Sequence, residues 1–124
     1  MSQFPSPAQD YILNNLSLDL YLMPNPPATS LKRMHKHDDS MVGVGIMPNC
    51  ILVVDNSINP VNGCWVYAVV DTQKLAKTFY EYDLHIELHS ENELKNYPPI
   101  ILLKGEGDWH IIGVITAYAF KSKY

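Results

Sequence analysis

Short apolar runs separated by turn signals dominate the sequence from residue 50 onward. β-Branched and aromatic residues fill these runs, and turn-forming residues stand between most of them, which is typical of short strands joined by tight turns. The clearest case is "LHIELH" at Leu84–His89, where apolar and polar residues alternate strictly, as in a strand with one buried face. The other predicted strands are Cys50–Asp55, Cys64–Val70, Lys74–Asp83, Ile100–Leu103 and Ile111–Phe120.

The N-terminal part predicts a different structure. Ser6 can cap a helix, Pro7 suits the first helical position and Gln9 completes a capping box, so we expect a short helix to begin here. The stretch Met23–Ser30 follows, and its three prolines favour an extended linker. The 124 residues therefore predict one compact, mostly-β domain with a short helix in front of it.

Charge and cysteine content exclude several classes of function. The formal net charge is −4 and no cluster of lysine and arginine occurs, so we expect no direct contact with nucleic acid. Cys50 and Cys64 form no C-x-x-C motif, and we expect two thiols in a reducing compartment. The sequence shows neither a signal peptide nor an apolar stretch long enough to span a bilayer, which predicts a cytoplasmic protein without a membrane contact.

Histidines and carboxylates suggest a metal site as one hypothesis. If they lie on strands, two sets would each share one strand face: His35, His37 and Asp39, and His85, Glu87 and His89. A zinc site needs three or four converging ligands, and neither set has a convincing further partner in the sequence. We therefore expect no metal and no other cofactor.

Ser40 is a candidate nucleophile. It precedes a glycine-rich segment, and a serine beside such a turn can expose its hydroxyl together with backbone amides that stabilise an oxyanion. Such a serine needs a base, and a lysine that burial keeps neutral near pH 7 can serve. Lys74 and Lys77 lie on opposite faces of one predicted strand, so at most one of them points at Ser40. From the residues alone, an ordinary serine without a catalytic role remains the alternative.

Seven short motifs occur in order along nearly the whole chain: "FPSPAQDYI" at 4–12, "PPAT" at 26–29, "DSM" at 39–41, "LVVD" at 52–55, "NG" at 62–63, "YPPI" at 97–100 and "GVI" at 113–115. In these motifs the chain resembles the UmuD-type SOS mutagenesis proteins, relatives of the self-cleaving domain of the LexA repressor. In that family the nucleophilic serine and the general-base lysine lie 37 residues apart, and the same spacing separates Ser40 from Lys77. The resemblance thus selects Lys77 over Lys74.

The resemblance implies a LexA-like Ser-Lys peptidase domain over residues 31–124, preceded by a residual N-terminal arm and short helix over residues 1–30. Ser40 would attack the scissile carbonyl, Lys77 would take the proton, and the backbone amides of Asp39 and Ser40 would stabilise the oxyanion. It also implies a homodimer that joins a Y-family translesion polymerase subunit in the SOS response to DNA damage. A RecA filament would promote cleavage of the full-length form.

Three departures from the family pattern bear on activity. Only three residues precede "FPSP" and no Cys-Gly or Ala-Gly bond occurs, so the chain resembles the processed short form and is not expected to cut itself at the family's site. Asp38 stands where the family usually has glycine, in a segment that is longer than usual. Leu75 replaces a threonine that could orient the lysine amine.

Three functions follow as hypotheses. The first is a processed accessory protein of an error-prone translesion polymerase, whose dyad has already finished its work. The second is an active Ser-Lys protease that cleaves partner chains in trans. The third is a structural or metal-binding module unrelated to this family. Cleavage in trans would separate the first two, and retained zinc would favour the third.

Overall fold

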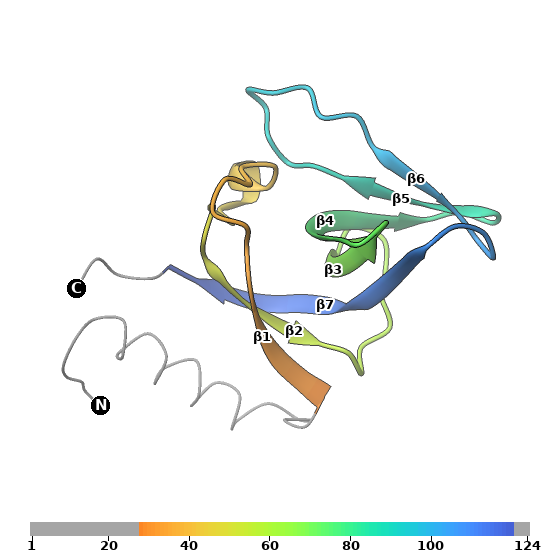
Figure 1. Cartoon of the computed structure of the whole chain (residues 1–124), viewed down its shortest axis with the longest axis horizontal. Helices are drawn as coiled ribbons and strands as arrows, with labels where there is room; N and C mark the ends of the chain where they lie inside the picture. Colours follow the sequence, from red (N-terminus) through yellow and green to blue (C-terminus); the bar gives the residue numbers. More distant parts are fainter. Residues whose placement is uncertain (1–27, 121–124) are drawn as a thin grey trace.

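A computed structural model describes residues 28–120. The predicted N-terminal helix, and the predicted linker as far as residue 27, lie outside the described residues. One antiparallel sheet of seven strands, in the order β1-β2-β7-β3-β4-β5-β6, forms the described part (Figure 1). The strands are β1 (Thr29–Arg33), β2 (Ile51–Asp55), β3 (Trp65–Val70), β4 (Gln73–Glu81), β5 (His85–His89), β6 (Ile100–Leu103) and β7 (Trp109–Ala119).

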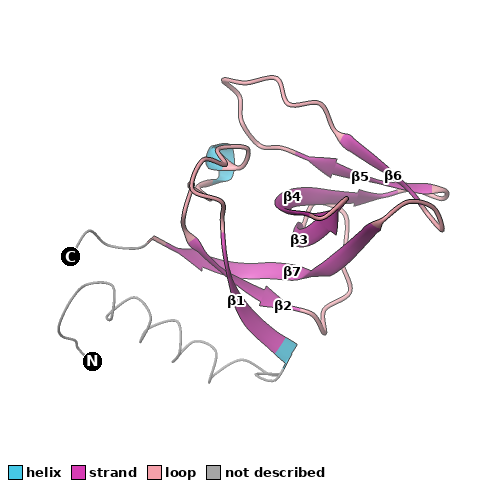
Figure 2. Ribbon diagram, in the orientation of Figure 1, coloured by secondary structure: helices cyan, strands magenta, loops and turns pink. Residues whose placement is uncertain are grey.

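The prediction of a mostly-β fold is confirmed, since strands and their connecting loops make up nearly all of residues 28–120 (Figure 2). Each of the six predicted runs contains a strand, although β7 begins earlier than expected because Trp109 and His110 continue its pairing with β3. The sequence pattern does not predict β1, since Thr29 and Ser30 belong to the expected linker but open this strand. Between residues 28 and 120 no helix is long and apolar enough to cross a membrane.

Two long loops lie at the same end of the sheet (Figure 1). Residues 34–50, which we call the serine loop, join β1 to β2 and contain turns and a short 3₁₀ helix, η2 (Val42–Val44). Residues 90–99, which we call the strap, join β5 to β6. The expectation that His35, His37 and Asp39 share a strand face is wrong, because the chain leaves β1 at Arg33 and turns instead of continuing extended.

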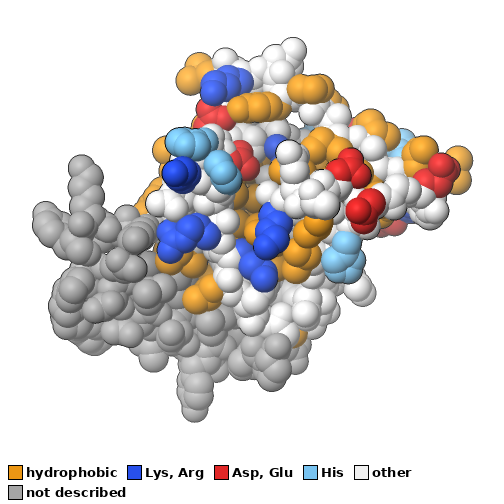
Figure 3. Space-filling model, in the orientation of Figure 1, with side chains coloured by type: hydrophobic (Ala, Val, Ile, Leu, Met, Phe, Trp, Pro, Cys, Tyr) orange, Lys and Arg blue, Asp and Glu red, His pale blue; other side chains and the backbone are white. Residues whose placement is uncertain are grey.

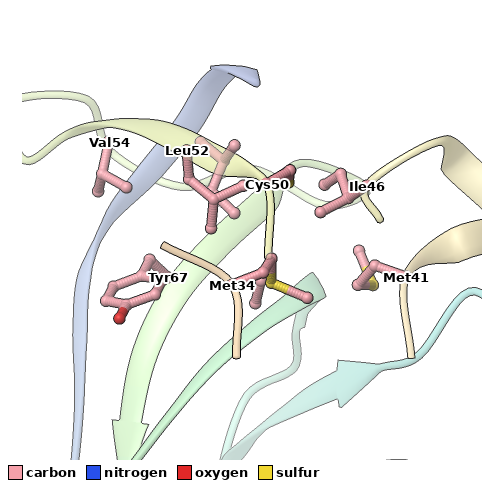
Figure 4. Packing of buried hydrophobic residues seen from close by; sticks show 9 residues of the cluster. Met34, Met41, Ile46, Cys50, Leu52, Val54 and Tyr67 are labelled. Carbon is pink, nitrogen blue, oxygen red and sulfur yellow. The ribbon is translucent and has the colours of Figure 1, made fainter. Parts of the chain in front are cut away.

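Buried side chains form two clusters against the sheet. The first cluster joins the serine loop to the central strands, and Figure 4 shows Met34, Met41 and Ile46 of the loop packed near Leu52 and Tyr67. Met41 and Ile46 are fully buried, and each such side chain contributes about 1.5–3 kcal/mol by leaving water. The second cluster consists of Val66, Ala68, Phe79, Ile86, Leu88, Leu102 and Val114. The first cluster therefore fixes the loop that carries Ser40 onto the sheet.

Candidate active site

Ser40 lies between the first cluster and the strap. Its neighbour Met41 is buried in the cluster, and its own carbonyl oxygen accepts a hydrogen bond of 2.7 Å from the Glu91 N–H. The Gly43 N–H donates to the Glu91 carbonyl oxygen at 2.6 Å. A side chain at Gly43 would not fit, because its Cβ would lie 2.5 Å from that oxygen. These contacts hold Ser40, which is only 2% exposed, against the start of the strap.

Asp39, the residue before the serine, binds the strap through both its backbone and its side chain. Asn92 Nδ2 donates to the Asp39 carbonyl oxygen at 2.9 Å. The Asp39 carboxylate accepts hydrogen bonds from Lys95 Nζ and the Tyr97 hydroxyl. These two hydrogen bonds, that of Lys95 first, lower the pKa of Asp39 and favour its charged form. The carboxylate therefore serves to bind the strap beside Ser40.

Lys77 is the buried lysine of β4, with 7% of its surface exposed. Its Nζ donates a hydrogen bond of 2.8 Å to Ser90 Oγ and lies 5.6 Å from the centroid of the Tyr97 ring. Burial lowers the pKa of Lys77, and the charge of Asp38 acts in the opposite direction. Lys74 is exposed at the start of β4, so of the two lysines considered only Lys77 offers a desolvated amine suited to a general base.

Ser40 and Lys77 share neighbours but make no hydrogen bond with each other. The Tyr97 ring lies near the lysine amine, and its hydroxyl binds the residue before Ser40. Ser90, which binds the lysine, directly precedes Glu91, which binds the serine backbone. Ser40 Oγ is buried and has no hydrogen-bond partner among residues 28–120. The structure thus brings the two predicted residues to the same strap but shows no contact between the Ser40 hydroxyl and the Lys77 amine.

The Ser40 N–H, one of the two predicted oxyanion donors, already has a partner. It donates a hydrogen bond of 2.9 Å to Asp38 Oδ1. A substrate oxyanion can use this amide only after the Asp38 carboxylate has moved away. The glycine that the family pattern leads us to expect at this position has no side chain for such a contact. Asp38 therefore acts on both predicted residues, through its hydrogen bond at Ser40 and through its charge at Lys77.

Strap residues surround Ser40 and Lys77, and the sequence analysis assigns none of them a role at the site, although Tyr97 opens the "YPPI" motif. Ser90 had a usable signal: continuing the pairing of β4 with β5 by one residue places it opposite Lys77. Asn92 has no such signal, and the "YPPI" motif marks Tyr97 without predicting its contact with Asp39, because both contacts depend on how the strap folds over the serine loop. Ser90 supplies the lysine with the hydroxyl partner that Leu75 cannot provide.

Neither hypothetical metal-ligand set forms. In the first set, the Asp39 carboxylate binds the strap, and only the two histidine rings lie near each other, with centroids 5.6 Å apart. In the second set, His85 Nε2 and His89 Nε2 each pair with a different oxygen of Glu87, at 3.0 and 2.9 Å. In the part of the chain that the structure describes, no group of three or more His, Cys, Asp or Glu side chains could hold a metal ion.

Comparison with known proteins shows which family and which individual proteins this chain is similar to. The sequence profile of the peptidase S24-like family matches residues 4–116, a range that includes both Ser40 and Lys77. The SamA protein of Salmonella typhimurium is 30% identical over 120 residues, which cover 97% of this chain and 79% of SamA. The ImpA protein of Escherichia coli is 36% identical over 74 residues, 60% of this chain and 50% of ImpA. The LexA repressor of Clostridium novyi is 36% identical over 64 residues, 52% of this chain and 30% of the repressor.

Proposed function

The chain belongs to the peptidase S24-like family, and we propose that within it the chain is a UmuD-like accessory protein of an error-prone translesion DNA polymerase in the SOS response, with a Ser40–Lys77 dyad. Membership of the family rules out the third hypothesis, a module unrelated to it. Similarity to the UmuD-like SamA and ImpA proteins supports the accessory role. The burial of Ser40 and Lys77 beside one strap supports the dyad.

The observation that carries the proposed dyad is a buried lysine amine without an ion-pair partner. Burying a charged amine is costly unless a carboxylate neutralises it. The ion pairs found within residues 28–120 involve other side chains, and Lys77 binds only the neutral Ser90 hydroxyl among its described hydrogen-bond partners. A perturbed lysine and a buried serine hydroxyl that both lie against the strap supply the two groups that a Ser-Lys peptidase requires.

The proposed reaction begins when Lys77 Nζ turns from Ser90 Oγ to Ser40 Oγ. The serine oxygen bonds to the scissile carbonyl carbon while its proton passes to the neutral lysine amine. The Asp39 and Ser40 amides stabilise the oxyanion, which requires the Ser40 N–H to leave Asp38. The C–N bond then breaks and Lys77 returns the proton to the leaving amine. Water, activated by the same lysine, hydrolyses the acyl ester and restores the serine.

The accessory role consists of binding to other proteins, not of peptide cleavage. By resemblance, the partners are a second copy of the chain, a Y-family translesion polymerase subunit and, for the full-length form, a RecA filament. The peptidase domain of residues 31–124 would make these contacts, with residues 1–30 as the remaining arm. Cys50 and Cys64 are free thiols, which agrees with a cytoplasmic location.

An assay in trans tests the dyad and separates the accessory role from an active protease. The substrate is a full-length UmuD-like relative, such as SamA, whose own nucleophilic serine has been replaced by alanine. Cleavage by the wild-type chain that is lost in both Ser40→Ala and Lys77→Ala supports the second candidate function, an active protease. The burial of Ser40 and Lys77 favours this candidate. No cleavage at any pH up to about 10, where even an ordinary lysine begins to be neutral, leaves the accessory role alone.

Co-purification tests the accessory role. The tagged chain is expressed with a Y-family polymerase subunit from the same organism, and the complex is isolated and its composition measured by mass spectrometry. We expect two copies of the chain for each polymerase subunit. A monomeric chain that never retains the polymerase would refute this part of the proposal.

A further inference from the structure

A cleft of about 560 Å³ opens beside the proposed dyad. The serine loop and the start of β4 line it, and two of its residues connect it to the site. Asp38 binds the Ser40 amide, and Leu75 lies two residues before Lys77 on the same strand face. Residues on one strand face are about 7 Å apart, so the lining residue Leu75 lies about that distance from Lys77 along β4. A peptide whose bond lies at Ser40 would therefore extend into it.

Positive charge and hydrogen-bond donors predominate in this cleft, although the whole chain has a net charge of −4. Figure 3 shows Lys, Arg and His side chains gathered on one face of the described part. Arg33 and Lys74, both exposed, supply the cleft with two full positive charges. The one carboxylate in the lining, that of Asp38, already accepts the Ser40 N–H.

Two lining residues keep hydrogen-bond donors available beyond their contacts within the described part of the chain. Arg33 Nη1 donates to the carbonyl oxygen and to Oδ1 of Asn49, both at 3.2 Å. These contacts fix the guanidinium and use only one of its three nitrogens. His35 Nδ1 accepts the His37 N–H at 3.1 Å, so a neutral His35 ring carries its proton on Nε2 and is a donor there. Such a lining suits a carboxylate.

We propose that this cleft binds an acidic side chain of the substrate peptide, at a position about three residues from the scissile bond. The position follows from Lys74, which lines the cleft and lies three residues, about 10 Å along β4, before Lys77, although its side chain leaves the opposite strand face. An extended peptide covers that distance in three residues. Asp38, at the Ser40 end of the cleft, repels an acidic residue closer to the bond. The inference rests on the proposed function, because it assumes that the bound segment is the one Ser40 cuts.

Binding to an inactive chain tests the cleft without relying on catalysis. Short fluorescein-labelled peptides with a central Ala-Gly bond carry glutamate either three residues before it, three residues after it, or next to it. Matched peptides carry glutamine. Anisotropy with the Ser40→Ala chain should show one of the two distant-glutamate peptides binding at least about fivefold more tightly than its glutamine match, and less so at high salt. Equal binding of all glutamate and glutamine peptides would overturn the proposal.

Two lysine variants test whether the preference for glutamate depends on the cleft. Lys74→Gln should weaken binding of the preferred glutamate peptide roughly two- to fivefold and leave its glutamine match unchanged. Lys104→Gln, which removes the same charge from an exposed lysine at the far end of β6, should change neither. Because Lys74 is exposed, its variant should fold normally, and an unchanged thermal midpoint checks this. Equal losses in the two variants would show a general charge effect and refute the cleft.

The outcomes also separate this proposal from the proposed function and from nucleic-acid binding. Selective binding of glutamate without cleavage by the wild-type chain leaves the cleft in place and removes the protease. Cleavage of the glutamate and glutamine peptides at equal rates and equal affinity keeps the dyad and removes the cleft. An oligothymidylate that binds more tightly than every peptide, and loses affinity in Lys74→Gln, would assign the cleft to a nucleic-acid strand and overturn the peptide assignment.

Discussion

If Ser40 and Lys77 form the proposed dyad, replacing Asp38 should make it a better catalyst. In the structure the Asp38 carboxylate accepts the Ser40 N–H at 2.9 Å, and its charge opposes the effect of burial on the pKa of Lys77. Asp38→Gly removes both contacts. Asp38→Asn removes the charge but keeps an acceptor oxygen for the amide, so it isolates the effect on the lysine.

The size of the effect follows from these contacts. A hydrogen bond to a charged group contributes about 1.5–3 kcal/mol, and water replaces part of this when the carboxylate is absent. Freeing the Ser40 N–H for the oxyanion should therefore lower the barrier by about 1–2 kcal/mol, or roughly five- to thirtyfold in kcat. Asp38 raises the pKa of Lys77, so in both variants this pKa falls and the neutral share of the amine at pH 7 grows.

The assay is cleavage in trans of a full-length relative, followed as kcat and kcat/KM against pH. Both variants should shift the acidic limb of kcat/KM to lower pH, and Asp38→Gly should also raise the plateau of kcat. Asp83→Asn, in the exposed turn between β4 and β5, is the matched control and should change neither. NMR titration of the Lys77 side chain provides a readout that does not need catalysis.

A result of the opposite sign would refute this reasoning. If both Asp38 variants fold normally but cleave more slowly than the wild type, the carboxylate supports the serine loop in a way that catalysis needs. If the titration midpoint of Lys77 stays the same in Asp38→Asn, the charge of Asp38 does not reach the amine, and only the hydrogen bond to Ser40 remains as a possible effect.

Three further changes test the site. Ser90→Ala should lower kcat about tenfold with KM little changed, because the Lys77 amine loses the hydroxyl that orients it. Ser90→Thr should restore kcat. Full activity in Ser90→Ala would contradict this role of Ser90. Gly43→Ala should lower the free energy of unfolding by about 1–3 kcal/mol in urea denaturation, because the new Cβ would clash with the Glu91 carbonyl oxygen. An unchanged urea midpoint would mean that the strap moves away at no cost. Burial lowers the pKa of Lys77 below the ordinary lysine value of about 10.4. Between these two pKa values the unfolded chain binds more protons than the folded chain. The free energy of unfolding of the wild type therefore rises with pH across this window. Lys77→Met should therefore be more stable than the wild type at pH 7, with a difference that shrinks toward pH 10.5; a constant difference would show that the amine is not desolvated.

The strands could be predicted from the sequence because most of them have a buried face that imposes alternation. β5 shows this most clearly, with Ile86 and Leu88 buried between half-exposed neighbours. β1 could not be predicted, because it is an edge strand without a fully buried residue and its sequence has no apolar alternation. The alternation of apolar and polar residues therefore predicts a strand only where one face of that strand packs against the core.

The site was predictable only in part, and for a different reason. The spacing from Ser40 to Lys77 came from a family resemblance, since no periodicity links a loop residue to a strand residue so far away. Ser90 follows from hairpin register, which short strands with a clear turn define well. The contacts of Asp38 and Asn92 depend on loop conformation, which tertiary packing determines, so local sequence holds no signal for them.

The order of strands in the sheet has a consequence for the newly made protein. β7, the last strand of the described chain to be synthesised, lies between β2 and β3. It joins the β1–β2 hairpin, whose connecting loop carries Ser40, to the β3–β6 strands, which carry Lys77. A ribosome that has released β1 to β6 has therefore delivered Ser40 and Lys77 on two pieces of sheet that no strand yet joins. The proposed peptidase capacity would therefore arise only after β7 has been made, which protects the growing chain and its neighbours on the polysome from premature cutting.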